Sequence, residues 1–361
     1  MLVFLARRVG MMLVTALCLT FIVFALTNLP AKLETLAKTQ AGSRMTDAEV
    51  ASWIERNGYG SPMLQRYGEW LGVVPGWVRE EANGTIRGRC VDRAGTPDAA
   101  GTRCGILQGD WGFSTRFRES VTSVLSARLG ATGWLMMWVL IVMVPMSLIV
   151  GVLAGMREGS RTDRALSTLA ITTTATPEYV SGVVFIALLA SSTVGLSPLL
   201  VGWGWATGPV LFQGNARSAL DGITFWNFTL PVLTVALYGM GYIARITRAS
   251  MTEVMTQQYI RTARLKGVSF PAIVMRHALR NALIAPFTVI MLQIPWLLNG
   301  VVITEVLFSY PGFGWSLYEA AINNDIELLL GASVVAVVVV LITQLISDLG
   351  YVWLNPRIRL S

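Results

Sequence analysis

The side chains that could carry chemistry in this chain are few and lie far apart. His277 is the only histidine, so neither a zinc site nor a serine–histidine–aspartate arrangement is expected. No G-x-x-x-x-G-K-[ST] segment occurs, so a phosphate-binding loop of that kind is not expected either. The sequence therefore predicts no catalytic residue, no cofactor site and no metal site, and it predicts a protein that is not an enzyme.

Two cysteines lie close together in a long polar segment. If Cys90 and Cys104 are outside the cytoplasm, they could form a disulfide. Sequence spacing does not establish disulfide geometry, so two free thiols are an equal alternative.

Glu178 is the one acidic residue well inside an apolar run, where it follows Pro177. Two interpretations stay open. Its carboxylate could form a polar wall of a translocation path at a helix break. It could equally lie near a helix end, where a neighbouring group satisfies it.

These residues belong to a chain that is too apolar for an ordinary soluble domain, since 53% of its 361 residues are hydrophobic and only 14% are charged. A membrane-spanning helix needs about 20 mostly apolar residues. The sequence therefore predicts an all-α integral membrane protein with six transmembrane helices, at residues 9–29, 131–156, 165–194, 227–246, 282–303 and 330–354. We interpret the first run as a retained helix and not as a cleaved signal peptide.

The basic residues predict the orientation. Arginines and Lys266 concentrate in short segments that share the side of the N-terminus, which favours two cytoplasmic termini. The segments at 30–130, 195–226 and 304–329 are then extracytoplasmic. Within the long insert, residues 61–72 are predicted to be helical, residues 81–105 a loop or hairpin, and residues 114–130 an amphipathic helix along the outer interface. Because the basic residues flank apolar runs, nucleic-acid binding is not expected.

Residues 245–281 form a cytoplasmic stretch with seven basic residues and one acid, Glu253. Gly267 is predicted to end a short transverse helix in a left-handed conformation, and Pro271 to lie in the first turn of the next helix. A basic juxtamembrane loop that touches anionic lipid is the alternative.

The segment QQYIRTARLKGVSFPAIVMRHALRNAL resembles the EAA loop of ABC importer permeases, in the variant of the dipeptide/oligopeptide subfamily. Arg261, Thr262, Ala263 and Gly267 fall on the E-A-A-x-x-x-G positions. The resemblance covers the chain from about residue 107 onward, through QGDWGFS, LPVLTVALYGMGYIARITRASMTEVM, VVITEVLFSYPGFGWSLYEAAINNDIELLLG and the final NPRIRL. The chain departs from the family at NLPAKLETL, where a PGDP-like segment is common, and in its longer insert.

The resemblance implies a type I importer permease in a bacterial inner membrane. Its partners would be a homologous second permease, two ATP-binding cassette ATPase subunits that bind the ATP, and an extracytoplasmic solute-binding protein that delivers peptides or related small solutes. The translocation path would form between the two permeases, with Glu178 and Asn299 as lining candidates. Ala263 is expected to pack into a groove of the ATPase. The coupling helix would contact the ATPase through Tyr259, Arg261, Thr262, Ala263, Arg264, Lys266 and Gly267.

The predicted organisation is an N-terminal helix at 1–29, an insert at 30–130 and a permease core at 131–361, with the coupling loop at 245–281. A secondary, ion-coupled transporter is the first alternative, and it would be expected to show inverted repeats and several buried ionisable groups. A membrane-anchored sensor is the second, and it would need a cytoplasmic signalling domain that no predicted cytoplasmic segment is long enough to form.

Overall fold

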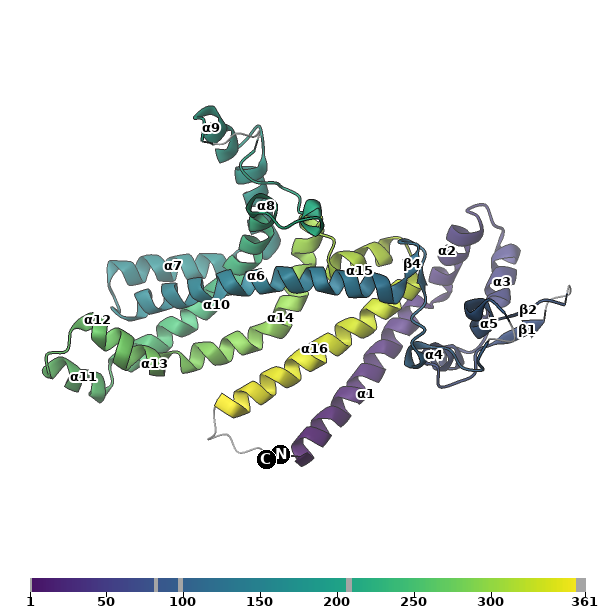
Figure 1. The fold of residues 1–361 in the computed structure, drawn as a ribbon, viewed down its shortest axis with the longest axis horizontal. Helices are drawn as coiled ribbons and strands as arrows, with labels where there is room; N and C mark the ends of the chain where they lie inside the picture. Colours follow the sequence, from purple (N-terminus) through teal and green to yellow (C-terminus); the bar gives the residue numbers. More distant parts are fainter. Residues whose placement is uncertain (1, 81–83, 97–99, 206–209, 355–361) are drawn as a thin grey trace. The chain divides into compact units, whose positions relative to one another are not determined.

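The computed structural model describes residues 2–80, 84–96, 100–205 and 210–354, apart from the side chains of residues 2–5, 295, 298–300 and 347–354. The predicted NPRIRL ending lies outside the described residues. The chain divides into two compact units. We call Met1–Ala127 with Ser316–Val339 the insert unit, and Arg128–Trp315 with Val340–Ser361 the core unit (Figure 1).

The insert unit is built mainly from short helices. Pro30 starts α2 at a position where its missing N–H costs no hydrogen bond. Thr46 and Glu49 form a reciprocal capping box that starts α3. The elements are α1 (Leu2–Thr27), α2 (Pro30–Ala41), α3 (Asp47–Arg56), α4 (Met63–Leu71), β1 (Val78–Glu80), β2 (Ile86–Gly88), α5 (Arg89–Ala94), a 3-10 turn (Ile106–Gln108), β3 (Phe113–Ser114) and β4 (Glu119–Ser120). Strands β1 and β2 pair antiparallel, as do β3 and β4.

Aromatic side chains from α1 and α4 form the core of the insert unit. The Tyr67 ring lies edge-on to Phe24 and stacks on Trp70. Ile326 and Leu330, from the start of α16 (Ile326–Leu354), complete this core. The predicted helix at 61–72 is therefore confirmed as α4. The segment predicted as a loop or hairpin contains β2, whose partner β1 lies just before it, and also α5. Helices α2, α3 and α5 were not predicted.

The core unit is helical in its described part. Its elements are α6 (Val121–Gly155, shared with the insert unit), α7 (Arg161–Ala175), α8 (Glu178–Phe185), a π-helical turn (Ile186–Ala190), α9 (Leu196–Gly202), a 3-10 turn (Arg217–Leu220), α10 (Phe225–Met255), α11 (Gln258–Leu265), α12 (Phe270–Ala272), a π-helical turn (Ile273–Ala278), α13 (Leu279–Ala282), α14 (Ile284–Leu307) and α15 (Phe313–Ile322, also shared).

Helix α10 is the centre of the core unit, where it packs against α7, α8 and α14 (Figure 1). Gly241 allows the close approach to α7, since a Cβ there would lie 2.4 Å from the carbonyl oxygen of Ala170. Leu135, Met143 and Ile243 are fully buried in the apolar cluster that joins α6 to α10. A membrane protein without a strong hydrophobic drive between its helices relies on this kind of close packing.

In the part of the chain that the structure describes, four helices are long and apolar enough to cross a membrane, namely Ala6–Thr27, Val121–Gly155, Phe225–Met255 and Ile326–Ile346. Two bent helix pairs raise the number to six if each pair is one span. The dipeptide before Glu178 explains the first bend of 102°: Pro177 disfavours a helical residue before it, and Thr176 is extended at φ −82° and ψ 122°. The predicted span at 165–194 is therefore broken at Pro177, and it counts as one span only if the two parts cross together.

The fifth predicted run, at 282–303, begins at a second bend, of 49° between Phe270–Ala282 and Ile284–Ile294. Pro286 has no N–H, so it cannot donate to the carbonyl oxygen of Ala282 four residues earlier. The Ser250 hydroxyl donates to that oxygen instead, at 2.8 Å. The missing N–H of Pro286 therefore explains the bend, and Ser250 on α10 supplies the hydrogen bond that the Ala282 carbonyl oxygen would otherwise lack.

The predicted interfacial helix at 114–130 is wrong as a separate element. Residues 113–120 form the β3–β4 hairpin, and α6 then runs for 35 residues without a break. The apolar spacing was read correctly, because Val121, Val124 and Leu125 are buried. No breaker stands between them and the apolar run, so the two segments join into one helix.

Candidate functional site

Helix α11 is positioned by a small apolar cluster. Ile260 is fully buried and Ala263 is 7% exposed. Both pack with Met251 and Met255 from the end of α10, and with Ile273 from the turn after α12. The predicted transverse helix at 261–267 is thus present, and it is seated on the chain's own residues.

Gly267 ends α11 in the predicted left-handed conformation, with a φ of +76°. Its N–H donates to the Arg264 carbonyl oxygen at 3.0 Å, and the Val268 N–H donates to that of Ala263 at 3.2 Å. This pair of bonds is a Schellman motif, which satisfies the last carbonyls of the helix. The predictions for Gly267 and for Pro271, in the first turn of α12, are confirmed.

The outward face of α11 differs from the predicted one in two respects. Ala263 faces the core unit's own cluster, so its expected place in a partner's groove is wrong; its small side chain lets α11 lie close to α10 and the following turn. Leu265 is 82% exposed and was missed by the sequence analysis. The helical spacing could have found it, since Leu265 lies on the side of α11 opposite Ile260 and Ala263. The other exposed side chains of this face are Tyr259, Arg261, Thr262, Arg264 and Lys266.

Polar contacts fix the segments around α11. The Asn281 amide donates to the Tyr259 hydroxyl at 2.9 Å. The Arg157 guanidinium lies 5.0 Å from the centre of the Phe270 ring, within the range of a cation–π contact. The loop before α7 is therefore tied to the segment that follows α11.

A buried ion pair joins α7 to α10 at the same end of the core unit. Arg248 donates to the Asp163 carboxylate through Nε at 2.5 Å and through Nη2 at 2.8 Å. The Gly159 N–H and the Ser167 hydroxyl also donate to Asp163, which is 3% exposed. This pair was not predicted from the sequence, where Arg248 is one of several basic residues in the segment. Ser160 at the N-cap of α7, three residues before Asp163, was the available signal.

The structure places the Glu178 carboxyl against the Thr304 hydroxyl, which donates to it. Glu178 is 8% exposed, so a neighbouring group satisfies it at the start of α8, as the second interpretation expected. Glu305, which follows Thr304 in the chain, is fully buried. It accepts from the Thr132 hydroxyl and, at 2.9 Å, from the Trp315 N–H, so it joins α6 to the turn before α15. Asn299 lies in α14, but its side chain is outside the described part of the structure.

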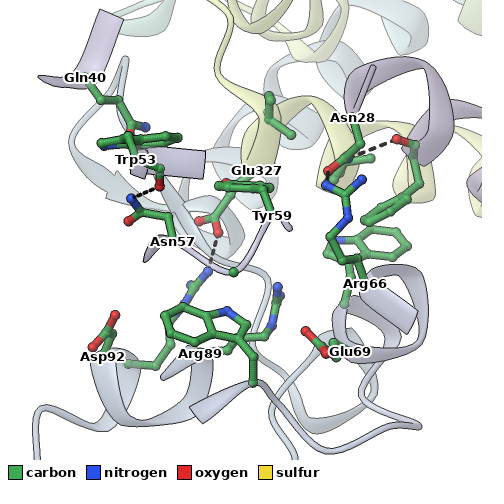
Figure 2. Close-up of a pocket in the computed structure, with 17 residues that line it drawn as sticks. Asn28, Gln40, Trp53, Asn57, Tyr59, Arg66, Glu69, Arg89, Asp92 and Glu327 are labelled. Carbon is green, nitrogen blue, oxygen red and sulfur yellow. Dashed lines mark hydrogen bonds and ion pairs between the residues drawn. The ribbon is translucent and has the colours of Figure 1, made fainter. Parts of the chain in front are cut away.

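The insert unit holds a separate pocket of about 190 Å³ (Figure 2). Burial lowers the pKa of the Arg89 guanidinium and raises the pKa of Tyr59 to about 12. The charged groups are paired in part: Arg93 donates to both Asp110 and Glu327. The pocket is lined by Phe24, Trp53, Tyr59, Trp70 and Trp77 and by charged residues of both signs.

A disulfide supports this pocket. It joins Cys90 to Cys104, with the Cα atoms 5.5 Å apart. Arg89, the neighbour of Cys90, donates through Nε to the Cys104 carbonyl oxygen at 3.4 Å. Among the described residues, no group of three or more histidine, cysteine, aspartate or glutamate side chains could hold a metal ion.

Comparisons with known proteins point to one family. Residues 147–360 match the family described as "Binding-protein-dependent transport system inner membrane component". The di/tripeptide transport system permease protein DppB of Pseudomonas aeruginosa is 30% identical, over 99% of both chains. The dipeptide transport system permease protein DppB of Escherichia coli K12 is 29% identical over 99% of both chains. The oligopeptide transport system permease protein AppB of Bacillus subtilis is 28% identical over 88% of this chain and 87% of its own.

The match to the family covers more than half of the chain, including α11, the ion pair between α7 and α10, and the contact between Glu178 and Thr304. The similarity to the Pseudomonas aeruginosa protein extends over the insert as well. The chain belongs to the family of binding-protein-dependent transport system inner membrane components.

Proposed function

We propose that this chain is the membrane-spanning permease subunit of an ATP-driven importer for peptides or related small solutes. A binding protein delivers the solute, and separate ATPase subunits bind and hydrolyse ATP. The peptide substrate is proposed from relatives that are named as dipeptide and oligopeptide permeases. The family membership favours this function over the ion-coupled secondary transporter.

The observation that carries the proposal is the way α11 packs against the rest of the core unit. Its inner residues, Ile260 and Ala263, are buried in the cluster that includes the end of α10 and the segment leading to α14. Its outer face offers an apolar side chain, Leu265, among three basic ones. A short rigid helix that is fixed to two long helices transmits rigid-body motion to them. This is the arrangement that a coupling helix needs.

The same proposal includes the partners and the orientation. The chain pairs with a homologous second permease, and the solute passes between them. Both termini and α11 lie in the cytoplasm, where the ATPases are. The insert lies outside, on the side from which the binding protein delivers the solute. The concentration of basic residues near α11 supports this orientation.

Coupled transport tests the proposal at Leu265. The complete transporter is reconstituted in proteoliposomes, and peptide uptake and ATP hydrolysis are measured together. Leu265→Ser keeps every charge but removes an apolar contact that would be buried on docking, worth roughly 1.5–3 kcal/mol. We expect uptake to fall by about tenfold or more and ATP hydrolysis to lose its dependence on solute.

Two variants complete this test. Leu64→Ser makes the same change at a leucine of α4 that is 71% exposed, and it should transport normally. The triple variant Arg261→Gln, Arg264→Gln and Lys266→Gln removes the charge that a lipid-contacting loop would need. Normal coupling in Leu265→Ser together with lost transport in the triple variant would contradict the proposal and show that α11 acts as an ordinary basic segment that contacts lipid.

A further inference from the structure

A groove between α7 and α10 is lined by arginine side chains from both helices. Its volume is about 500 Å³, and one face of each helix lines it. Arg164 and Ile171 lie seven residues apart on α7, which places them on the same face of that helix. Arg245 and Ile246 line it from α10. The groove belongs entirely to the core unit, where α7 and α10 lie side by side (Figure 1).

The charges of the groove do not balance. Three arginines and one aspartate line it, and Arg248 is already bound to Asp163 by two hydrogen bonds. Arg164 and Arg245 are exposed, and neither side chain forms a hydrogen bond or ion pair within the described part of the chain. Two positive charges therefore face the opening of the groove without a partner.

The groove changes from basic to apolar along the helices. Its basic end lies near α11, because Arg248 is three residues from Met251, which packs in the α11 cluster. Ile171 is 55% exposed and lies further along α7, about 10 Å from the level of Arg164 at 1.5 Å per residue. A ligand that fills the groove would need an anionic head and an apolar continuation that runs toward the membrane interior.

From this we infer that the groove binds an anionic phospholipid. Arg164 and Arg245 contact its phosphate, and Ile171 contacts the first part of an acyl chain. Basic pockets between transmembrane helices are suited to such headgroups because an arginine guanidinium forms charge-assisted, often bidentate bonds to phosphate. A soluble phosphate shares the headgroup chemistry, but it would leave the exposed isoleucine without a partner.

The test measures lipid binding to the full chain, purified in detergent without added lipid. Native mass spectrometry gives the apparent affinity for dioleoyl phosphatidylglycerol and for dioleoyl phosphatidylcholine, and glycerol 3-phosphate is added as a competitor. We expect a preference for phosphatidylglycerol and no displacement by glycerol 3-phosphate at matched concentration. In the double variant Arg164→Gln, Arg245→Gln the affinity for phosphatidylglycerol should fall roughly 30-fold, the product of two basic contacts.

The matched control is Arg261→Gln, Arg264→Gln. It removes the same charge from exposed positions on α11, outside the groove, and should keep the wild-type affinity. Equal losses in the two double variants, or no preference between the two lipids, would mean that general attraction to anionic lipid accounts for binding, and the inference would fail. Displacement by glycerol 3-phosphate would overturn the lipid assignment in favour of a soluble phosphate ester.

Discussion

Gly267 at the end of α11 fixes how the chain leaves that helix. Gly267 has open space around it, since a Cβ would meet no atom within 4 Å. Glycine is therefore favoured at this position by the backbone conformation, a φ of +76°, and not by a lack of space. Asparagine tolerates this region far better than a β-branched residue does. Substitutions at Gly267 thus separate backbone conformation from side-chain volume.

We expect Gly267→Val to impair transport and Gly267→Asn to be nearly normal. Valine in the left-handed region would cost roughly 1–2 kcal/mol or force the Schellman turn to open. An open turn would release α11 from its packing against the end of α10. Uptake and ATP hydrolysis in proteoliposomes, with the membrane level of each variant measured by immunoblot, check this. Equal activity of the two variants would show that the turn does not control coupling.

Ala263 gives a second residue-level prediction, with a different cause. Ala263→Trp would overpack the cluster with Met251 and Ile273, which typically costs about 1–3 kcal/mol. We expect α11 to be displaced, so that protease cleavage within residues 257–268 becomes faster than in the wild-type chain and transport falls. The control is Thr262→Trp, which adds the same bulk to an exposed neighbour. Unchanged cleavage in Ala263→Trp would contradict the buried position.

The residues that sequence reasoning placed correctly are those whose role is local. Gly267 and Pro271 are fixed by backbone conformation, which a short stretch of sequence specifies. The residues that it missed depend on partners far along the chain. Asp163 and Arg248 are 85 residues apart, and the sequence around either residue does not identify the other as its partner. Ala263 was misplaced because a small residue fits a groove in a partner as readily as one within the same chain.

At the scale of the elements, hydropathy predicted where apolar helices lie and failed at their continuity. The bend between α7 and α8 follows from Pro177, and the bend before α14 is completed by Ser250 on another helix. Helix α6 shows the opposite error, because the apolar face of its first turns was taken for a separate helix. Continuity depends on hydrogen bonds at individual residues, to which a window of mean hydropathy is insensitive.

The β1–β2 hairpin and α5 are tied to the following loop by the disulfide between Cys90 and Cys104. We predict that the pair is oxidised and extracytoplasmic in cells. A membrane-impermeant maleimide should then label neither cysteine in intact cells until a reductant is added, whereas Cys90→Ser should expose Cys104 to labelling at once. Labelling of wild-type cells without reductant would refute the disulfide. Failure to label Cys90→Ser would argue against the orientation.

At the scale of the whole molecule, the chain belongs to a family of inner membrane components of transport systems. We predict that the active transporter contains this chain and a second, homologous permease. Affinity purification through a tag on this chain should recover the second permease together with the ATPases, and the complex should hydrolyse ATP in response to the loaded binding protein. An active complex that contains this chain as its only permease would contradict the prediction.

The insert unit is discontinuous in sequence, and this determines when it can mature. Ser114 donates to Asp325 at 2.6 Å across 211 residues, and Ile326 and Leu330 complete the aromatic core around Phe24 and Trp70. Translation delivers those partners only near the end of synthesis. The insert unit must therefore remain incomplete and open to proteases until residues 316–339 have been synthesised. Chains that stall or lose their C-terminal helix would be marked for degradation by this unfinished domain.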